Sequence, residues 1–533
     1  MPLQQVRRLE YAGPYVPKYK PLPSTVKLLY GTAPVVGKLS DDAEEAVVNY
    51  GRLLEAKNKH IRKRTFNQNF FNDFRALLTP RQRDQIREFR KLNFGQITVH
   101  LRRLKEASST PAEKKKRKET NDQLKQRHGV CKKNGKVVEE LGVWMVEPSG
   151  IFIGRPDNPR HGRIKLRIRP SDVVVNCSGA CPPPPWGNWK AQIFDPSQAW
   201  VAKYTNNLKA IKYIFPGIDS SVRKHSDVAK FEVAQSLGRR IAGVRKTYEK
   251  LIAMRLIDNL GSPSTSLTEI GNEKGPDAAD TVGCTTLRKE HISLKSRHKV
   301  CLDFKGKDSI RLKKEFEISL PVFNAISRNI RRKRERDQVF DLIQAQTVNK
   351  YLKDLGDNYS AKVFRTFNAS KTFDDKLHMQ KMRTPKKKLT IADKLFIYKK
   401  ANLAIAKLCN HQKTVNTKLA MRALGGQKLN RQKKQDKLRI LKEKLKGKVG
   451  IQKLLCQRQI SKLEENIKEL ETRIYLKDEG MEYALGTSQA NYLDPRITVA
   501  WCKRNKVPLE KVWSANQRKK YVWANKATSQ FRF

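Results

Sequence analysis

The chain has 533 residues, and its 111 Lys and Arg against 52 Asp and Glu give a formal net charge of +59 at pH 7. At roughly 100 to 200 residues per domain, this length predicts about three or four domains and excludes a mini-protein. So basic a chain repels itself unless it meets a polyanion, and nucleic acid is the partner we expect, with an anionic membrane surface as the alternative.

The sequence shows neither a membrane span nor a secretion signal. It contains no run of about 18 apolar residues, and the amino terminus, MPLQQVRRLE, lacks the apolar core of a signal peptide. We therefore expect a soluble intracellular protein. Its 8 cysteines are scattered without a CxxC pair, so reduced thiols are expected. Cys177 and Cys181 have a zinc-like spacing, but no second Cys or His pair follows, and we expect no metal site.

The first fifth of the chain predicts an extended start and then helices. Residues 1–20 form an N-terminal extended segment, because the prolines between Pro14 and Pro23 prevent a helix. Residues 21–108 predict a mixed α/β domain in which Phe70, Phe74 and Leu77 recur at helical intervals. The basic stretch 105–132 predicts either a solvated helical arm or a patch for phosphate or nuclear import.

Residues 109–217 predict a second domain built of strands and loops. Between Val143 and Val175 the apolar period shortens to two, and Gly and Pro interrupt the pattern. The segment 150–169, GIFIGRPDNPRHGRIKLRIR, is rich in cations that a strand end can present along a phosphate backbone. The following CPPPPW, 181–186, predicts a stiff joint.

Residues 218–412 predict a mainly helical domain. Leu237, Ile241, Val244, Tyr248 and Leu251 step by three or four and so share one helix face. A strand through Val300, Leu302 and Phe304 ends at a turn, 306–309, with a lysine at its tip. Thr390 and Asp393 form a capping box for a helix that reaches His411.

Residues 413–480 predict an antiparallel coiled-coil hairpin that buries its apolar stripe against itself. Ile460, Leu463, Ile467, Leu470 and Ile474 follow a 3-4-3-4 spacing. Leu438, Leu441 and Leu445 do the same before glycines interrupt the run at 447–450. Residues 481–533 remain as a short C-terminal domain.

Several enzyme signatures are missing from the sequence: GxxxxGK[ST], GxGxxG after a strand, and HExxH. ATP-driven translocation and zinc-dependent hydrolysis are therefore not expected.

The segment 485–512, LGTSQANYLDPRITVAWCKRNKVPLEKV, closely resembles the active-site region of eukaryotic type IB DNA topoisomerases. The resemblance continues, in family order, through GNEKGPDAADTVGC (271–284), GKDSIR (306–311), AKVFRTFNAS (361–370) and LCNHQ (408–412).

This resemblance implies catalytic residues and a reaction. Tyr492 stands at the position of the nucleophile that forms a 3′-phosphotyrosyl bond. Arg365 and His411 stand where the nonbridging phosphate oxygens are held, and Lys307 where O5′ is protonated. Arg155, Lys165, Asp308 and Asn491 match positions close to the duplex. The family needs no cofactor and no metal, and its implied setting is duplex DNA in the nucleus, held by a monomeric clamp.

One departure from the family pattern concerns a second catalytic arginine, whose position is occupied by Glu269 after an apparent insertion, GSPST (261–265). A carboxylate there would repel the transition state, so either another cation such as Arg255 or Arg288 substitutes, or the chain is weakly active. Gln489 stands where the family motif has Lys, which removes a charge that we expect to face DNA.

The resulting expectation is a multidomain α+β protein: a mixed α/β cap of a DNA clamp, a mainly α catalytic domain of the tyrosine recombinase and topoisomerase IB type, and a coiled-coil linker. A tyrosine recombinase is disfavoured, because Lys362 rather than His stands three residues before Arg365. A non-catalytic DNA clamp stays open because of Glu269. An RNA-binding scaffold would fit the charge but leaves the tyrosine motif unexplained.

Overall fold

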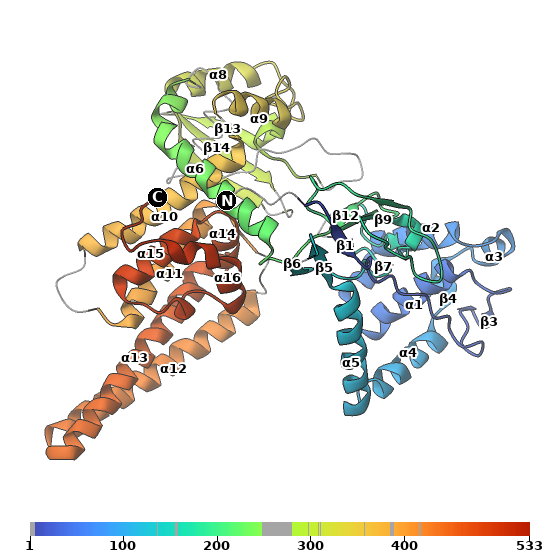
Figure 1. Cartoon of the computed structure of the whole chain (residues 1–533), viewed down its shortest axis with the longest axis horizontal. Helices are drawn as coiled ribbons and strands as arrows, with labels where there is room; N and C mark the ends of the chain where they lie inside the picture. The colour runs from blue at the N-terminus through green and yellow to red at the C-terminus, as the bar shows by residue number, and fades with distance from the viewer. Residues whose placement is uncertain are drawn as a thin grey trace. The chain divides into compact units, whose positions relative to one another are not determined.

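The computed structural model describes residues 6–135, 137–154, 158–247, 280–296, 298–306, 309, 311–356, 358–383, 389–413, 415 and 417–533. It combines helices and strands, with long helices prevailing in the second half (Figure 1). The chain divides into two compact units, Met1–Ser226 with Lys274–Asp280, and Asp227–Glu273 with Thr281–Phe533. The mixed α+β composition expected from the sequence is thus present.

The first unit contains a helical layer around an aromatic core. Ser40 caps the first helix by accepting a hydrogen bond from the Ala43 amide. Tyr50, Phe66, Phe70 and Phe74 are almost fully buried together, and the spacing of Phe70 and Phe74 predicts the burial of those two. The helices are α1 (Asp41–Glu55), α2 (Arg64–Ala76), α3 (Pro80–Gln85), α4 (Gly95–Ala107) and α5 (Pro111–His128). No residue of α5 is buried, so residues 111–128 of the basic stretch form a solvated helix.

The strands of the first unit form small sheets. The orders are β1-β5-β6, β3-β2-β4, β7-β8 and β10-β9-β11-β12, all antiparallel except the pair β9 and β10. Alternate residues of β9, Val173 and Val175, are fully buried, which is the period of two expected from the sequence. The strands are β1 (Leu9–Tyr11), β2 (Leu29–Tyr30), β3 (Ala33–Pro34), β4 (Leu92–Asn93), β5 (Val130–Lys133), β6 (Val137–Glu140), β7 (Gly150–Ile151), β8 (Ile164–Lys165), β9 (Val173–Asn176), β10 (Ala191–Ile193), β11 (Ala202–Thr205) and β12 (Ile211–Ile214).

In the second unit a three-stranded antiparallel sheet packs against a helix. Val300, Leu302 and Phe304 of β14 are buried with Val322 and Ile326 of α8, and β14 and β15 form the expected hairpin. These elements are β13 (Ile292–Lys295), β14 (Lys299–Lys305), β15 (Arg311–Glu317), α8 (Leu320–Ile330) and α9 (Ala345–Asp354).

The remaining helices of the second unit share cores rich in aromatic and aliphatic side chains. The capping box of Thr390 and Asp393 begins α11 as predicted. Helix α6 carries the expected stripe, with Leu237 and Val244 buried, whereas Tyr248 and Leu251 lie outside the described residues. The helices are α6 (Ser221–Thr247), α10 (Ala361–Arg383), α11 (Ile391–Leu408), α12 (Thr417–Lys446), α13 (Gly450–Gly480), α14 (Leu485–Asn491), α15 (Pro495–Asn505) and α16 (Ala515–Lys520).

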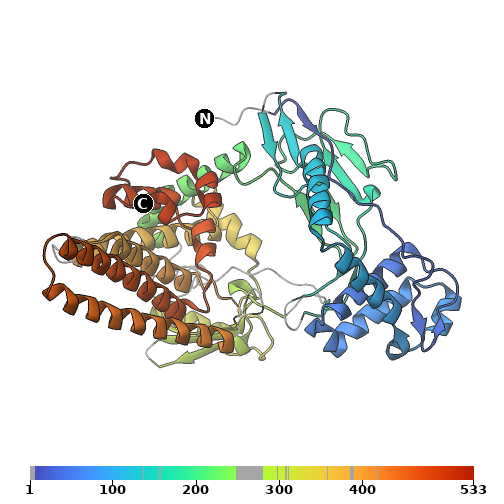
Figure 2. The same cartoon turned by 90° about the horizontal axis from the view of Figure 1, so that it is seen from below.

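Helices α12 and α13 lie side by side in both views, as an antiparallel hairpin (Figures 1 and 2). An ion pair of 2.7 Å joins Lys442 to Glu464 across the two helices. The expectation of a self-contained hairpin is wrong at its base, because the second half of α13 also packs on α11. There Lys468 pairs with Asp393 at 3.0 Å, and the rings of Phe396 and Tyr475 meet edge to face.

Within the described residues, no helix is long and apolar enough to cross a membrane. All eight cysteines are free thiols, and seven of them are buried. In the same part of the chain, no three His, Cys, Asp or Glu side chains gather closely enough to hold a metal ion.

Candidate active site

Tyr492 occupies the short junction between two helices. Its amide donates to the Ser488 carbonyl at 2.9 Å, which closes α14. Two residues later, Asp494 caps α15, whose first residue is Pro495. A proline at the first helical position favours a helix start and disfavours helical structure in the residue before it. The local sequence therefore interrupts the helix directly after Tyr492 and leaves this half-buried side chain at a fixed bend.

A buried hydroxyl of α10 holds this bend. Ser370 Oγ donates to the Tyr492 carbonyl at 2.8 Å and accepts a hydrogen bond from the Asp494 amide at 3.0 Å. The Asp494 carboxylate is fully buried and pairs with Arg496 at 2.7 Å. Burial raises the pKa of Asp494, and the neighbouring Arg496 guanidinium opposes that rise. The backbone on both sides of Tyr492 is thus tied to the interior.

Arg365 projects from α10 over the tyrosine ring. Its guanidinium carbon lies 4.7 Å from the ring centroid of Tyr492, and the residue is only 9% exposed. Its Nη2 atom donates to the Cys409 carbonyl at 2.7 Å, and this hydrogen bond fixes the guanidinium group at the end of α11. Burial raises the pKa of the Cys409 thiol to about 11, although Arg365 opposes the rise. Cys409 therefore stays a neutral thiol at neutral pH.

His411 reaches the same place from just beyond α11. The helix ends because Asn410 adopts a left-handed conformation with φ of 50°. The His411 ring then stacks on Tyr492, with centroids 5.5 Å apart and planes inclined by 21°. Its Nδ1 atom is 2.7 Å from the Oγ atom of Ser488, which is fully buried in α14. This hydrogen bond sets the plane of the imidazole.

A basic residue binds the C-terminal end of α14, and a second one shares its acidic partner. Lys520 Nζ donates to the Ala490 carbonyl at 3.2 Å and lies 3.5 Å from Asp227. Lys230 pairs with the same carboxylate at 3.0 Å. Burial lowers the pKa of Lys230, while Asp227 opposes that shift. Cations at a helix C-terminus stabilise its unsatisfied carbonyls, so Lys520 supports the segment that leads into Tyr492.

Of the residues singled out from the sequence, Tyr492, Arg365 and His411 come together, although they are separated by up to 127 positions in the chain. Lys307, Asp308, Arg155 and Glu269 lie outside the described residues. Arg288, a suggested substitute cation, pairs with Glu290 at 2.6 Å.

Lys165 and Asn491 have partners within the protein. Lys165 Nζ pairs with Glu147 at 2.7 Å, so a phosphate would have to displace this carboxylate. Asn491 is exposed and donates through Nδ2 to the Thr487 carbonyl at 3.0 Å.

Gln489, which stands where the family motif has Lys, forms hydrogen bonds within the protein. Gln489 donates to the Tyr398 hydroxyl at 3.1 Å and accepts from Gln517 at 3.2 Å. A neutral amide can satisfy both its donor and its acceptor inside the protein, which explains why this side chain turns inward.

Sequence reasoning missed the two serines that position the site. Ser370 and Ser488 lie inside segments that resemble the family, but a serine in a helix carries no signal of its own. Only their complete burial and their bonds to Tyr492 and His411 identify them.

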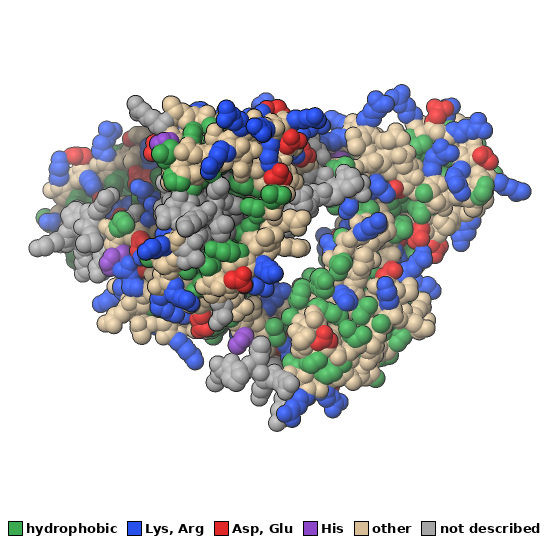
Figure 3. Space-filling model, turned by 90° about the horizontal axis from the view of Figure 1, so that it is seen from above, with side chains coloured by type: hydrophobic (Ala, Val, Ile, Leu, Met, Phe, Trp, Pro, Cys, Tyr) green, Lys and Arg blue, Asp and Glu red, His purple; other side chains and the backbone are tan. Residues whose placement is uncertain are grey.

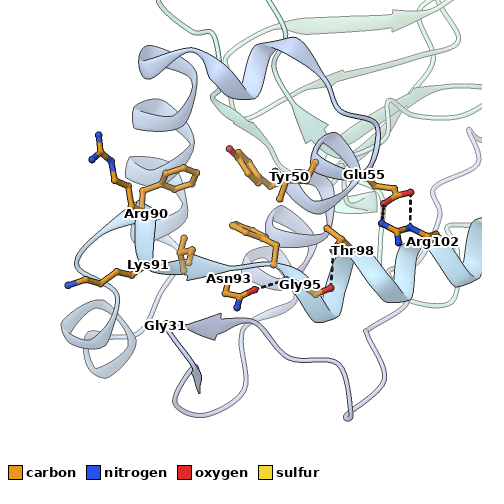
Figure 4. Close-up of a pocket in the computed structure, with 13 residues that line it drawn as sticks. Gly31, Tyr50, Glu55, Arg90, Lys91, Asn93, Gly95, Thr98 and Arg102 are labelled. Atoms are coloured by element: carbon orange, nitrogen blue, oxygen red, sulfur yellow. Dashed lines mark hydrogen bonds and ion pairs between the residues drawn. The ribbon is translucent and has the colours of Figure 1, made fainter.

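The first unit contains a cavity of about 720 Å³ between α1, β4 and α4 (Figure 4). Aromatic and aliphatic side chains such as Tyr50 and Phe94 line it. At its rim Arg102 pairs with Glu55 at 3.1 Å, while Arg90 and Lys91 extend away from Tyr50 (Figure 4). This lining has no nucleophile beside a base, so the candidate active site is the one around Tyr492.

Basic side chains also dominate the surface. On the face drawn in Figure 3, Lys and Arg side chains are more numerous than Asp and Glu, in line with the net charge of +59. Such a surface attracts a polyanion over much of its area.

Comparison with known proteins identifies related sequences along nearly the whole chain. Models of the eukaryotic DNA topoisomerase I DNA-binding fragment, the catalytic core and the C-terminal topoisomerase domain match residues 4–216, 219–446 and 464–533. DNA topoisomerase 1 of Drosophila melanogaster is 36% identical over 98% of this chain and 54% of its own length. The mitochondrial DNA topoisomerase I of Homo sapiens is 36% identical over 97% of this chain and 90% of its own length. The chain thus spans about half the length of the Drosophila relative.

Proposed function

The chain belongs to the eukaryotic DNA topoisomerase I family, and we propose from this premise that it relaxes supercoiled duplex DNA through a transient break in one strand. The observation that supports this most directly is that the Arg365 guanidinium and the His411 ring both pack against the ring of Tyr492. A phenol flanked by a cation and an imidazole is the set that an attack on a phosphodiester requires.

The cleavage step begins with attack by the Tyr492 hydroxyl oxygen on phosphorus. A bond forms between that oxygen and the 3′ phosphate, the bond to O5′ breaks, and the tyrosine proton passes to solvent. Charge grows on the nonbridging oxygens, and we assign Arg365 and His411 to stabilise it. Because Nδ1 of His411 bonds to Ser488, Nε2 is the atom assigned to the phosphate. Lys307 is assigned to protonate the leaving O5′.

Religation is the reverse of this step. The phosphotyrosyl bond conserves the energy of the phosphodiester, so the 5′ hydroxyl can attack it without ATP. While the bond persists, the duplex can rotate about the intact strand and release supercoils of either sign. Because Arg365, His411 and Lys307 supply the charge and the proton, we expect no obligatory metal or cofactor.

The remaining parts of the chain would hold the substrate. We propose that 21–108 and 109–217 form the cap of a monomeric clamp, that 218–412 is the catalytic domain, and that 413–480 is a coiled-coil linker to the C-terminal domain 481–533. Contacts would go chiefly to phosphates, with Arg155, Lys165, Asp308 and Asn491 near the break. The nucleus is the proposed location, and a fluorescent fusion of the chain would test it against mitochondria, for which some relatives are named.

A second candidate is a DNA clamp of the same fold with weak or no activity, and Glu269 favours it. Loss of one transition-state donor commonly costs about 100- to 1000-fold in rate. If Glu269 faces the phosphate, Glu269→Arg should accelerate cleavage at least about tenfold, whereas an unchanged rate would remove this position from the active site.

Covalent trapping tests the proposal. A duplex with a nick that prevents religation is incubated with the protein, and adducts that resist denaturant are counted. The wild type should become attached to the 3′ end of the cut strand, and Tyr492→Phe should form no adduct while binding duplex DNA as before. Tyr483→Phe is the matched control, because it removes a hydroxyl close by in the sequence and should leave the adduct. An adduct in Tyr492→Phe would refute the assignment.

A further inference from the structure

The tip of the α12–α13 hairpin exposes aliphatic side chains that the hairpin itself does not use. Val449 is 83% exposed, Ile451 77%, Leu454 60% and Leu455 52%. Apolar side chains scattered singly over a surface are normal, but a cluster of them commonly marks a contact site. We call Val449, Ile451, Leu454 and Leu455 the tip cluster; it lies at the turn between α12 and α13 and in the first turns of α13, and this turn is the far end of the hairpin in Figure 1.

The tip cluster is distinct from the stripe that pairs the two helices. Cys456, Ile460 and Ile467 of α13 are buried, and the Cys456 thiol lies against the Leu441 carbonyl of α12. At 3.6 residues per turn, Ile451, Leu454 and Leu455 point to roughly the opposite side of α13. Pairing with α12 therefore cannot account for these side chains.

The surroundings of the tip cluster are strongly basic. From Lys444 to Lys462 the sequence contains six Lys and Arg and no Asp or Glu. In the part of the chain that the structure describes, no ion pair is formed by Lys448, Lys453 or Arg458. A partner that covers the tip would thus have to supply negative charge as well as apolar side chains.

Nucleic acid and a second copy of the chain fit this combination poorly. Phosphate groups do not form favourable contacts with aliphatic side chains, and nucleic-acid bases stack on aromatic rings. No aromatic residue occurs between positions 440 and 460. Another copy would bring the same charge of +59. A helix that lies in a membrane surface needs an apolar face along its length, whereas this cluster covers only the start of α13.

We propose that the tip cluster docks an acidic segment of another protein, with apolar side chains at helical spacing that contact Ile451, Leu454 and Leu455. Lys448, next to Val449, and Arg458, one turn after Leu454 on the same face of α13, would face its carboxylates. Four aliphatic side chains make a small interface. Small interfaces are typical of weak, transient complexes, so a dissociation constant on the order of micromolar is expected. This contact would recruit or place the protein, and it is separate from the chemistry at Tyr492.

The test selects peptides from a displayed random library on the immobilised full chain. The strongest enriched peptide is then labelled, and its affinity is measured by fluorescence anisotropy. The enriched sequences should be rich in Asp and Glu, with apolar residues spaced by three or four. A triple variant, Ile451→Ser with Leu454→Ser and Leu455→Ser, should bind the peptide at least about tenfold more weakly. Leu429→Ser, which changes a leucine 59% exposed elsewhere on α12, should bind it within about twofold of the wild type.

Each other outcome overturns the proposal. Enriched peptides without an excess of Asp and Glu, or no enrichment at all, would exclude an acidic protein segment as the partner. Equal peptide binding by the triple variant, with an unchanged melting temperature, would remove the tip cluster from the contact. Stronger binding to vesicles of phosphatidylcholine with phosphatidylserine than to the peptide, lost in the triple variant, would indicate a membrane surface instead.

Discussion

Ser488→Ala should slow DNA cleavage without weakening DNA binding. Ser488 is fully buried, and its Oγ atom bonds to Nδ1 of His411 at 2.7 Å. If His411 carries positive charge as it meets the phosphate, this hydrogen bond is of the charged kind, which contributes about 1.5 to 3 kcal/mol. At 1.36 kcal/mol for each factor of ten, its loss predicts a cleavage rate lower by about 10- to 160-fold.

The assay is single-turnover cleavage of the nicked duplex, with binding followed separately by anisotropy. Thr487→Ala is the matched control, because it removes the hydroxyl of the preceding, exposed residue and should leave the rate within about twofold. Thermal melting of both variants establishes that the fold is retained.

A double-mutant cycle decides whether Ser488 acts through His411. In a His411→Gln background, Ser488→Ala should cost little further rate, because the group that it positions has already been removed. Two fully additive losses, or a wild-type rate in Ser488→Ala, would refute the positioning role. A loss of duplex binding equal to the loss of rate would also contradict it.

Other predictions concern the hairpin, acid stability and salt. Deletion of 433–465 with a Gly-Ser bridge removes the distal hairpin but keeps the base that packs on α11, so melting temperature and cleavage rate should change little; loss of folding would show that the distal part belongs to the core. Burial opposes ionisation of Glu139, but hydrogen bonds from Lys133 and Ser221 outweigh it and hold its pKa below the usual 4.5. The stability that this carboxylate contributes is therefore present above about pH 4.5 and lost as the pH falls further. The melting temperature of Glu139→Gln should accordingly fall less between pH 5 and 3 than that of the wild type, and an equal fall would contradict the assignment. The logarithm of the affinity for duplex DNA should fall with the logarithm of salt concentration at a slope steeper than about −3, and a shallower slope would argue against an encircling clamp.

Regular periodicity made much of the fold predictable from the sequence. The stripe of α6, the alternation in β14 and the capping box at Thr390 each specify an element through local chemistry, and each is present. The base of the hairpin was not predictable in this way. The same spacing that pairs α13 with α12 cannot show that Tyr475 also meets Phe396 of α11, because periodicity shows which face is apolar but not which element covers it.

The site was predictable to a different degree. The motif around Tyr492 and the segments with Arg365 and His411 pointed to three side chains that the fold places in contact. The hydroxyls of Ser370 and Ser488 could not be inferred, since their role depends on burial between helices. Gln489 turned inward for a similar reason, because its amide finds partners on Tyr398 and Gln517 that are distant in the sequence.

Relaxation of a supercoiled plasmid in EDTA without ATP tests the central claim most directly. The wild type should relax both negatively and positively supercoiled plasmid, and Tyr492→Phe should relax neither while it still binds the plasmid. Relaxation by Tyr492→Phe at the wild-type rate would contradict the account, and so would a wild type that binds the plasmid but leaves its supercoils unchanged.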